Sequence, residues 1–185
     1  MKIAVFHGTA GSPSGNWFPW LKETLAPHHQ VTIPTLPTPQ GQNVESWSKS
    51  VMHQIPDLAD YDILIGHSCG AAFLPHFIMN HHLTPRQVIL VSPFYQAIGY
   101  PEYDVLLGTF FLDDIQLQNF RRYLIDHCMK THIFHGDNDP YISVDQARHI
   151  SGAANIPLTI IKGGGHLNAE FGYLKFPELI DALAV

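Results

Sequence analysis

The most informative stretch of the sequence is residues 61–74, which reads YDILIGHSCGAAFL. Residues 61–65 end in the apolar run Ile63-Leu64-Ile65, which is typical of a buried strand, and residues 71–74 open an apolar helix. Between them, Gly66-His67-Ser68-Cys69-Gly70 fits the pattern Gly-x-Ser-x-Gly. A serine on a tight turn from a strand into a helix is the arrangement of a nucleophile elbow, which holds the hydroxyl clear of the sheet. The simpler interpretation is a serine that only caps the helix.

Apolar runs and helical stretches alternate on both sides of this turn. The predicted strands are residues 2–7, 30–34, 61–66, 87–92, 131–135 and 157–162. The predicted helices are residues 16–25, 44–55, 69–80, 114–128, 144–152 and 176–183. Strands that are apolar nearly throughout are buried on both faces, as in a parallel sheet covered by helices. We therefore predict an α/β fold with a three-layer, doubly wound, mostly parallel sheet of about six strands, in one domain over residues 1–185.

One segment, residues 93–111, departs from this alternation because it is aromatic and irregular. A loop of this length in a compact domain is usually functional or covers a site. We therefore expect a lid or a pocket wall here. The alternative is an ordinary packed excursion that covers the edge of the sheet.

Composition and charge exclude several classes of protein. Hydrophobic residues make up 45% of the 185 residues and charged residues 14%, which argues against disorder. Ten Lys and Arg against sixteen Asp and Glu give a net charge of −6, so we expect no nucleic-acid partner. The two cysteines, Cys69 and Cys128, form no disulfide framework and suit a reducing compartment. The N-terminal apolar run is too short for a membrane span, so we expect a cytoplasmic protein without a membrane partner.

A nucleophilic serine needs a base, and the base is a histidine held in the right tautomer by a carboxylate. In a strand–elbow–helix architecture the chain order is serine, acid, histidine. His166 is the preferred base, because it follows the strand at 157–162 and three glycines that permit a tight backbone. Three other histidines lie within or beside regular elements and are less free to reach Ser68: His132, His135 and His149.

The acid is expected in the loop after the strand at 131–135, where Asp137 and Asp139 both occur. We prefer Asp139, because the following Pro140 pushes it out of the helical region and stiffens the turn. Asp137 is the alternative, although its side chain is also suited to ordering the loop through bonds to the backbone.

The oxyanion of the transition state needs backbone N–H donors. The first is expected from Cys69, directly after the nucleophile, and the second from the loop after the first strand, at Thr9 or else at Ala10. That loop fits no phosphate-binding pattern, which disfavours a nucleotide or flavin binder. The Cys69 thiol is a weaker candidate nucleophile, because it lies one residue beyond the elbow. No His-Glu-x-x-His spacing occurs, so we expect no metal and no cofactor.

These motifs resemble those of the retinoblastoma-binding serine hydrolase family and its small bacterial relatives, within the α/β-hydrolase superfamily. The resemblance is carried by HGTAG (7–11), NWFPWL (16–21), LPTP (36–39), GHSCG (66–70), LVS (90–92), GDNDPY (136–141) and GGHLN (164–168). It implies a compact sheet without the first two strands of larger α/β-hydrolases and without a large cap domain. It also implies Ser68 as nucleophile, Asp139 as acid and His166 as base. The Leu-x-Cys-x-Glu motif associated with partner binding in the mammalian member is absent, so no such partner is expected.

The sequence thus predicts a serine hydrolase of the carboxylesterase type, which cleaves a small or medium ester or thioester through an acyl-enzyme on Ser68. Six aromatic side chains are candidates for an apolar pocket: Trp17, Phe94, Tyr95, Phe110, Phe111 and Tyr141. The expected partner is a small ester-type substrate, and the residues single out no protein partner. Two alternatives stay open: a peptidase or amidase with the same residues, and a binding or regulatory protein with little or no turnover.

Overall fold

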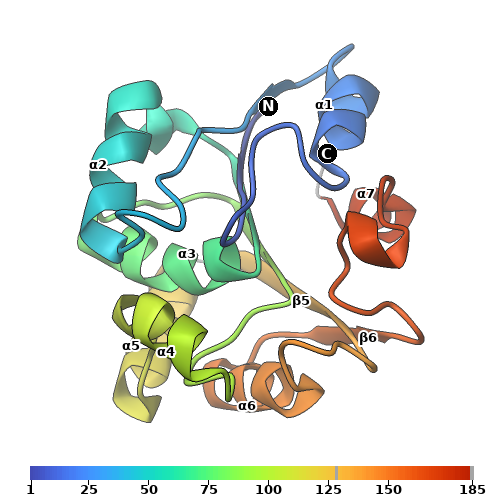
Figure 1. Ribbon diagram of the computed structural model, residues 1–185. Coiled ribbons are helices and arrows are strands. Elements are labelled where there is room, and N and C mark those ends of the chain that lie inside the picture. The colour runs from blue at the N-terminus through green and yellow to red at the C-terminus, as the bar shows by residue number, and fades with distance from the viewer. Residues whose placement is uncertain (128, 184–185) are drawn as a thin grey trace.

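Six parallel strands form one sheet in the middle of the molecule (Figure 1). The computed structural model describes residues 1–127 and 129–183. In the spatial order β2-β1-β3-β4-β5-β6, the strands are β2 (Gln30–Thr32), β1 (Lys2–Phe6), β3 (Ile63–His67), β4 (Gln87–Val91), β5 (Lys130–Gly136) and β6 (Leu158–Ile161). Phe6 of β1 lies beside Gly66 of β3, and His67 of β3 lies beside Val91 of β4. The predicted α/β class and the parallel sheet of six strands are confirmed.

Helices cover both faces of this sheet and complete three layers (Figure 1). One face carries α2 (Val44–Gln54), α3 (Cys69–Asn80), α5 (Asp114–Asp126) and α6 (Val144–Ala154). The other face carries α1 (Phe18–Leu25) and α7 (Pro177–Ala182). Successive strand residues point to opposite faces. In β3, for example, Leu64 joins the first core, while Ile63 and Ile65 join the second.

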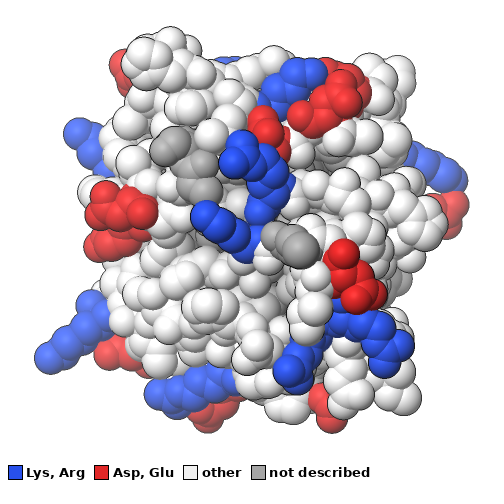
Figure 2. Space-filling view, turned by 180° about the vertical axis from the view of Figure 1, so that it is seen from behind, with Lys and Arg blue, Asp and Glu red and all other residues white. Residues whose placement is uncertain are grey.

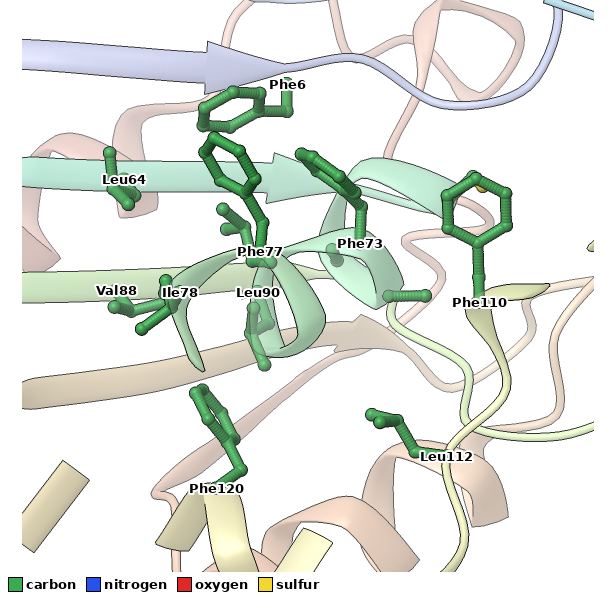
Figure 3. Packing of buried hydrophobic residues seen from close by; sticks show 14 of the residues in the cluster. Phe6, Leu64, Phe73, Phe77, Ile78, Val88, Leu90, Phe110, Leu112 and Phe120 are labelled. Carbon is green, nitrogen blue, oxygen red and sulfur yellow. The ribbon is translucent and has the colours of Figure 1, made fainter. Parts of the chain in front are cut away.

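Aromatic residues of α3 fill the larger core. The rings of Phe73 and Phe77 stack with their centroids 4.7 Å apart, and both contact Phe6 of β1 (Figure 3). Full burial of one such side chain stabilises a fold by roughly 1.5–3 kcal/mol. This packing presses α3 against the strands directly after Ser68, so the core fixes the position of the turn.

The observed helices and strands lie within a few residues of the predicted ones. The helix predicted over 16–25 begins only at Phe18, because Asn16 has a positive φ of 50° and Pro19 occupies the first turn. The helix predicted over 114–128 ends at Asp126, and Cys128 lies outside the described residues.

The expectation that residues 93–111 are irregular holds for residues 93–100 and is wrong for residues 101–110. The segment contains α4 (Pro101–Leu107) followed by a 3₁₀ turn over Gly108–Phe110. Pro101 stands at the start of α4, where its missing N–H costs nothing. The Asp104 carboxylate accepts hydrogen bonds from the backbone N–H groups of Ile98 and Gly99 at 2.7 and 3.1 Å. Proline and acidic residues are ordinary signals of a helix start, and here they outweigh the aromatic content.

Charged side chains of both signs share the surface. On the face shown in Figure 2, Lys and Arg lie among Asp and Glu. Exposed pairs such as Lys49 and Glu45, 2.6 Å apart, contribute little to stability because water and salt screen them. Among the described residues, no helix is long and apolar enough to cross a membrane.

Gly66 and Gly70 allow β3 and α3 to approach each other closely. A Cβ atom on Gly70 would collide with the carbonyl group of Phe6, and one on Gly66 would collide with the carbonyl group of Gly70. Both obstacles are backbone atoms, which cannot move without displacing a strand or a helix. We therefore expect Gly70→Ala to lower the free energy of unfolding by about 3 kcal/mol or more, as measured by urea unfolding.

Gly152 provides the matched control for this substitution. It lies inside α6, and a Cβ atom there would meet no atom within 4 Å. Alanine favours a helix over glycine by roughly 0.5–1 kcal/mol, so Gly152→Ala should stabilise the protein slightly. Equal effects of the two substitutions would show that backbone crowding at the turn is not what Gly70 relieves.

Candidate active site

Ser68 lies on the sharp turn between β3 and α3, at the carboxyl edge of the sheet. Its backbone has φ 56° and ψ −120°, a conformation that costs a residue with a side chain roughly 1–3 kcal/mol. Its side chain makes no cap hydrogen bond to α3, so helix capping does not account for this serine. A Cβ atom on Gly8 would lie only 2.8 Å from the Cβ of Ser68, which shows how closely the loop after β1 approaches.

The position of this turn within the sheet is the one where ligands bind in open α/β folds. The chain runs outward in one direction from β1 to β2 and in the other from β3 to β6, so the strand order reverses between β1 and β3. Loops that leave the carboxyl ends of two such strands diverge and form a crevice. Ser68 and the loop at residues 7–11 both lie at this crevice.

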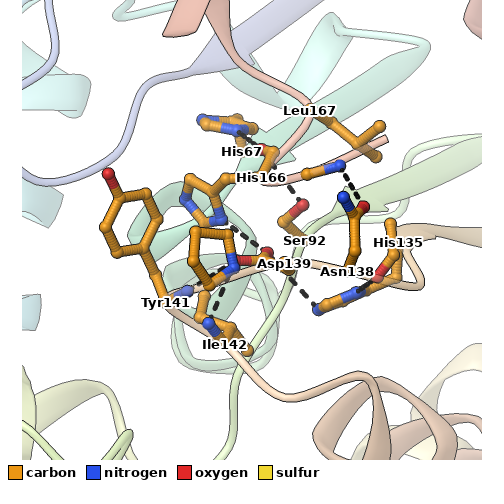
Figure 4. Close-up of polar contacts among 12 residues, drawn as sticks. His67, Ser92, His135, Asn138, Asp139, Tyr141, Ile142, His166 and Leu167 are labelled. Atoms are coloured by element: carbon orange, nitrogen blue, oxygen red, sulfur yellow. Dashed lines mark hydrogen bonds and ion pairs between the residues drawn. The ribbon is translucent and has the colours of Figure 1, made fainter. Parts of the chain in front are cut away.

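His166 and Asp139 come from the loops that follow β6 and β5. His166 Nδ1 lies 2.7 Å from Asp139 Oδ2 (Figure 4). The carboxylate is buried, and its Oδ1 accepts the N–H groups of Tyr141 and Ile142 at 2.9 and 3.1 Å. Burial disfavours the charge, but the hydrogen bonds from His166 and the backbone outweigh it, so the pKa of Asp139 lies below its ordinary value. An ionised Asp139 keeps the proton on Nδ1 and leaves Nε2 free to act as a base.

The two residues before Asp139 order the loop. Asp137 Oδ1 accepts a hydrogen bond from the N–H of Gly163 at 2.7 Å, and Asn138 Oδ1 accepts one from the N–H of Gly165 at 2.8 Å. These bonds tie the loop after β5 to the loop that carries His166. Of the two candidate acids, Asp139 is thus the one whose carboxylate contacts His166.

Three further side chains fix the backbone around His166, a role that was not predicted for any of them. His67 Nε2 lies 3.0 Å from the carbonyl oxygen of His166, and the Ser92 hydroxyl donates to the same oxygen at 3.3 Å (Figure 4). The indole N–H of Trp17 donates to the carbonyl oxygen of Leu167 at 3.1 Å. Their positions in the sequence could have indicated this role, because His67 ends β3 and Ser92 directly follows β4 at the same edge of the sheet.

The other histidines considered as bases make contacts of their own. His132 Nε2 pairs with the hydroxyl of Thr159 at 2.8 Å, and the ring of His149 stacks on Tyr95 with centroids 4.3 Å apart. His135 is fully buried behind the acid, with Nε2 3.8 Å from Asp139 Oδ2 and Nδ1 2.8 Å from the carbonyl oxygen of Gly136. None of these three histidines is among the described residues that line the cavity with Ser68.

Ser68 and His166 line one cavity of about 430 Å³. Its walls are mostly aromatic and aliphatic: Thr9, Ala10, Ser68, Phe94, Ile98, Tyr100, Tyr103, Leu107, Tyr141, Ile142, His166, Asn168 and Glu170. Five of these residues come from the segment 93–111, which therefore forms a wall of the cavity. A wider groove of about 840 Å³ along α2 lacks such an arrangement, since its serine, Ser48, donates to the carbonyl oxygen of Val44 in the same helix.

Two of the six predicted pocket residues, Phe94 and Tyr141, line this cavity. The Tyr141 ring stands edge-on to His166, with centroids 5.3 Å apart (Figure 4). The other four residues lie outside the wall of this cavity. Trp17 and Phe110 are fully buried core residues, Tyr95 packs against His149, and Phe111 packs against the core at the ring of Phe94. Asn168 and Glu170 were missed, although they follow His166 directly in the sequence.

The two predicted oxyanion donors flank Ser68. Cys69 is the first residue of α3, and Thr9 belongs to the loop after β1 that lines the cavity. Among the described residues, neither the backbone N–H of Thr9 nor that of Cys69 donates a hydrogen bond. Burial raises the pKa of the Cys69 thiol well above its ordinary value, so this thiol stays protonated and is a poor nucleophile.

Buried neutral histidines should make the protein sensitive to acid. Burial, with His166 nearby, lowers the pKa of His67 to about 3 from 6.5. Between these values the unfolded chain binds a proton that the folded protein does not, so stability falls as the pH falls. This one group contributes roughly 1.4 kcal/mol per pH unit. Burial also lowers the pKa values of His7 and His135, which act in the same direction. We expect urea unfolding to show a clear loss of stability from pH 7.5 to pH 5.

The variant His67→Gln isolates the share of His67 in this acid sensitivity. A glutamine amide can still donate to the carbonyl oxygen of His166 but takes up no proton in this range. Unfolding of the variant should therefore take up about one proton fewer, and the slope of the unfolding free energy against pH should be smaller by the corresponding amount. An unchanged slope would mean that His67 is protonated in the folded protein.

No group of three or more His, Cys, Asp or Glu side chains is placed to hold a metal ion within residues 1–127 and 129–183. The polar groups of the site are a serine, an imidazole, a carboxylate and free backbone N–H groups. Nucleophilic attack on a carbonyl carbon uses this set of groups.

Comparison with solved structures shows the same fold in several hydrolases. The structure of YdeN from Bacillus subtilis superposes with a TM-score of 0.79 at 22% identity, covering 97% of this chain and 95% of that one. A YdeN-like hydrolase from Pectobacterium atrosepticum gives 0.69 at 22% identity, covering 100% and 89%. Est1E from Butyrivibrio proteoclasticus, solved with ferulic acid bound, gives 0.67 at 14% identity, covering 100% and 90%.

Comparison by sequence extends this likeness. YdeN of Bacillus subtilis strain 168, which is named as a hydrolase, is 24% identical over 188 residues, covering 98% of this chain and 94% of YdeN. The family model described as serine hydrolase matches residues 3–185, nearly the whole chain. The chain therefore belongs to the serine hydrolase family.

Proposed function

We propose that this protein hydrolyses small or medium carboxylic esters or thioesters, with Ser68 as nucleophile, His166 as base and Asp139 as the group that orients the base. One observation carries the proposal. Ser68, on its strained turn, and His166, which is paired with Asp139, line the same cavity. Lone serines and histidines are common, but an acyl-transfer mechanism needs this combination. Membership of the serine hydrolase family supports it.

In the proposed mechanism, Ser68 Oγ attacks the substrate carbonyl carbon while His166 Nε2 accepts the hydroxyl proton. The carbonyl oxygen becomes an oxyanion, to which the backbone N–H groups of Thr9 and Cys69 donate. The tetrahedral intermediate expels the alcohol or thiol, which takes the proton from His166, and an acyl-enzyme remains on Ser68. Water then attacks the acyl group with the same base, releasing the carboxylic acid and restoring Ser68.

Within the family, we propose a closer kinship with the retinoblastoma-binding serine hydrolases. The segments that carry this resemblance include the three that hold the site, at residues 66–70, 136–141 and 164–168. The proposal does not extend to that family's protein partner, because the Leu-x-Cys-x-Glu motif is absent. We further propose that residues 1–185 act as one catalytic domain in the cytoplasm, which the single sheet and the low count of two cysteines favour.

A fluorophosphonate probe tests the proposal, because it reacts with activated serines and not with ordinary hydroxyls. Intact-mass measurement should show one adduct on folded protein and none on heat-denatured protein, and peptide mapping should place the adduct on Ser68. A panel of p-nitrophenyl esters, a thioester and an anilide then ranks the substrates, with an ester or thioester expected first. Folded protein without an adduct would favour the binding or regulatory alternative, and faster cleavage of the anilide would favour an amidase.

The charge of the cavity predicts which esters are accepted. No Lys or Arg lines the described cavity, and its one exposed carboxylate, Glu170, accepts a hydrogen bond from Tyr141 at 2.6 Å. A substrate carboxylate would therefore meet like charge and no cationic partner. We expect p-nitrophenyl hemisuccinate to have a kcat/KM at least about tenfold below that of p-nitrophenyl butyrate at low salt.

The variant Glu170→Gln serves as the control for this charge effect. Glutamine keeps an acceptor for the Tyr141 hydroxyl but removes the charge. It should raise kcat/KM for the hemisuccinate several-fold and leave the butyrate nearly unchanged. If both esters respond equally, Glu170 acts on the shape of the cavity and not through its charge.

A further inference from the structure

Gln42 is a buried glutamine that no step of the proposed mechanism uses. It is 5% exposed and precedes Asn43, the N-cap residue of α2. Its Nε2 donates to the Thr9 hydroxyl at 2.8 Å and lies 3.6 Å from Cys69 Sγ. A single side-chain amide thus contacts the side chains of both residues proposed to supply the oxyanion donors.

The orientation of this amide is set by a second contact. Gln42 Oε1 accepts a hydrogen bond from the Thr38 hydroxyl at 2.6 Å, and Thr38 Oγ1 accepts one from the N–H of Ala10 at 2.7 Å. Since Thr38 uses its only proton on Oε1, the Nε2 side of the amide must face Thr9. The amide of Gln42 thus joins the hydroxyls of Thr38 and Thr9.

The loop that this cluster holds is strained. Ala10 has a positive φ of 54°, a conformation that costs a non-glycine residue roughly 1–2 kcal/mol. Ala10 also lines the cavity beside Thr9 and Ser68. A strained loop keeps its geometry only where neighbouring contacts overdetermine it, and the contacts here run through Thr38 and Gln42.

We propose that Gln42 is a positioning residue for the oxyanion hole, holding the Thr9 loop and the start of α3 at a fixed separation. The inference rests on the proposed function, because it assigns Gln42 a part in ester hydrolysis at Ser68. Gln42 is not among the residues that line the described cavity. It acts by keeping two backbone N–H groups aimed at the point where the oxyanion forms, and donors held in place before reaction are what make such a site effective.

The test compares Gln42→Leu with Gln146→Leu. Gln146 is also a buried glutamine, 7% exposed, and its amide bonds the backbone of Tyr95, Gln96 and Ala97, away from Thr9 and Cys69. Both variants lose one buried amide, so both are expected to lose stability. Only Gln42→Leu should lower kcat for p-nitrophenyl butyrate, by about 10–100-fold, with KM changed less than threefold. Its affinity for an alkylboronic acid, which mimics the tetrahedral intermediate, should fall by a similar factor.

A double-mutant cycle adds a readout that simple loss of stability would not move. Thr9→Val removes the hydroxyl that accepts from Gln42 but keeps the backbone N–H of residue 9. If Gln42 acts through Thr9, the double variant Gln42→Leu/Thr9→Val should be no slower than the slower single variant. Thr9→Ser, which keeps the hydroxyl, should lower kcat less than Thr9→Val does.

Three results would overturn the inference. Equal kcat values for Gln42→Leu and Gln146→Leu, at matched folded fractions, would show that only stability is at stake. Additive effects of Gln42→Leu and Thr9→Val would show that Gln42 does not act through the Thr9 hydroxyl. Wild-type protein that is folded but neither labelled nor active would remove the proposed function, and the positioning role with it.

Discussion

Ser68→Ala is expected to lower the turnover of p-nitrophenyl butyrate by about 10⁴–10⁶-fold. Alanine has no group that can attack the carbonyl carbon, so no acyl-enzyme forms and only solvent attack remains. The oxyanion donors and the cavity stay in place, and the free energy of unfolding should not fall, because Ser68 makes no cap hydrogen bond to α3. Fluorophosphonate labelling should disappear together with turnover.

Ser48→Ala is the matched control for this loss. Ser48 is a helical serine whose hydroxyl donates to the carbonyl oxygen of Val44 at 2.7 Å, on α2 and outside the cavity of Ser68. Its removal should leave labelling and turnover within about twofold of wild type. An adduct that survives Ser68→Ala would assign the nucleophile to another residue and refute the proposed mechanism.

The arrangement of the site was accessible from sequence because each of its residues follows the end of a strand. Ser68 follows β3, Asp139 follows β5 and His166 follows β6. In a parallel sheet, the carboxyl ends of all strands meet at one edge, so order along the chain becomes proximity in space. Predicting the strands to within a few residues was therefore enough to predict which loops meet. The sequence also favours Asp139 over Asp137, because Pro140 restricts the backbone of the residue that precedes it.

The walls of the cavity could not be predicted in the same way. Trp17, Phe110 and Tyr141 are all large aromatic residues, yet the first two are core and only Tyr141 faces the cavity. Hydrophobicity indicates that a side chain is buried, but it does not indicate whether the side chain packs in the core or lines a substrate cavity. The distinction depends on tertiary packing, above all on where α4 lies. Gln42 escaped prediction for a related reason, since its partners are 33 and 27 residues away in the sequence.

Asp139→Asn is expected to lower kcat by about 10⁴-fold at neutral pH while leaving the fold intact. The carboxylate accepts a hydrogen bond from His166 Nδ1–H at 2.7 Å. An asparagine can present its NH₂ group to that nitrogen instead, which favours the tautomer with the proton on Nε2. In that tautomer His166 cannot take the proton of Ser68, although every atom of the site is nearly in place. The measurement is steady-state hydrolysis of p-nitrophenyl butyrate, together with the rate of fluorophosphonate labelling.

Asp137→Asn separates this effect from the mere loss of a carboxylate in the same loop. Asp137 accepts a hydrogen bond from the N–H of Gly163 through Oδ1, and asparagine keeps that acceptor. We expect kcat within about threefold of wild type. The contrast between the two variants measures the tautomer of His166, because both remove one negative charge from the loop that bonds the His166 segment. Equal losses would mean that loop order, and not the contact between Asp139 and His166, limits the reaction.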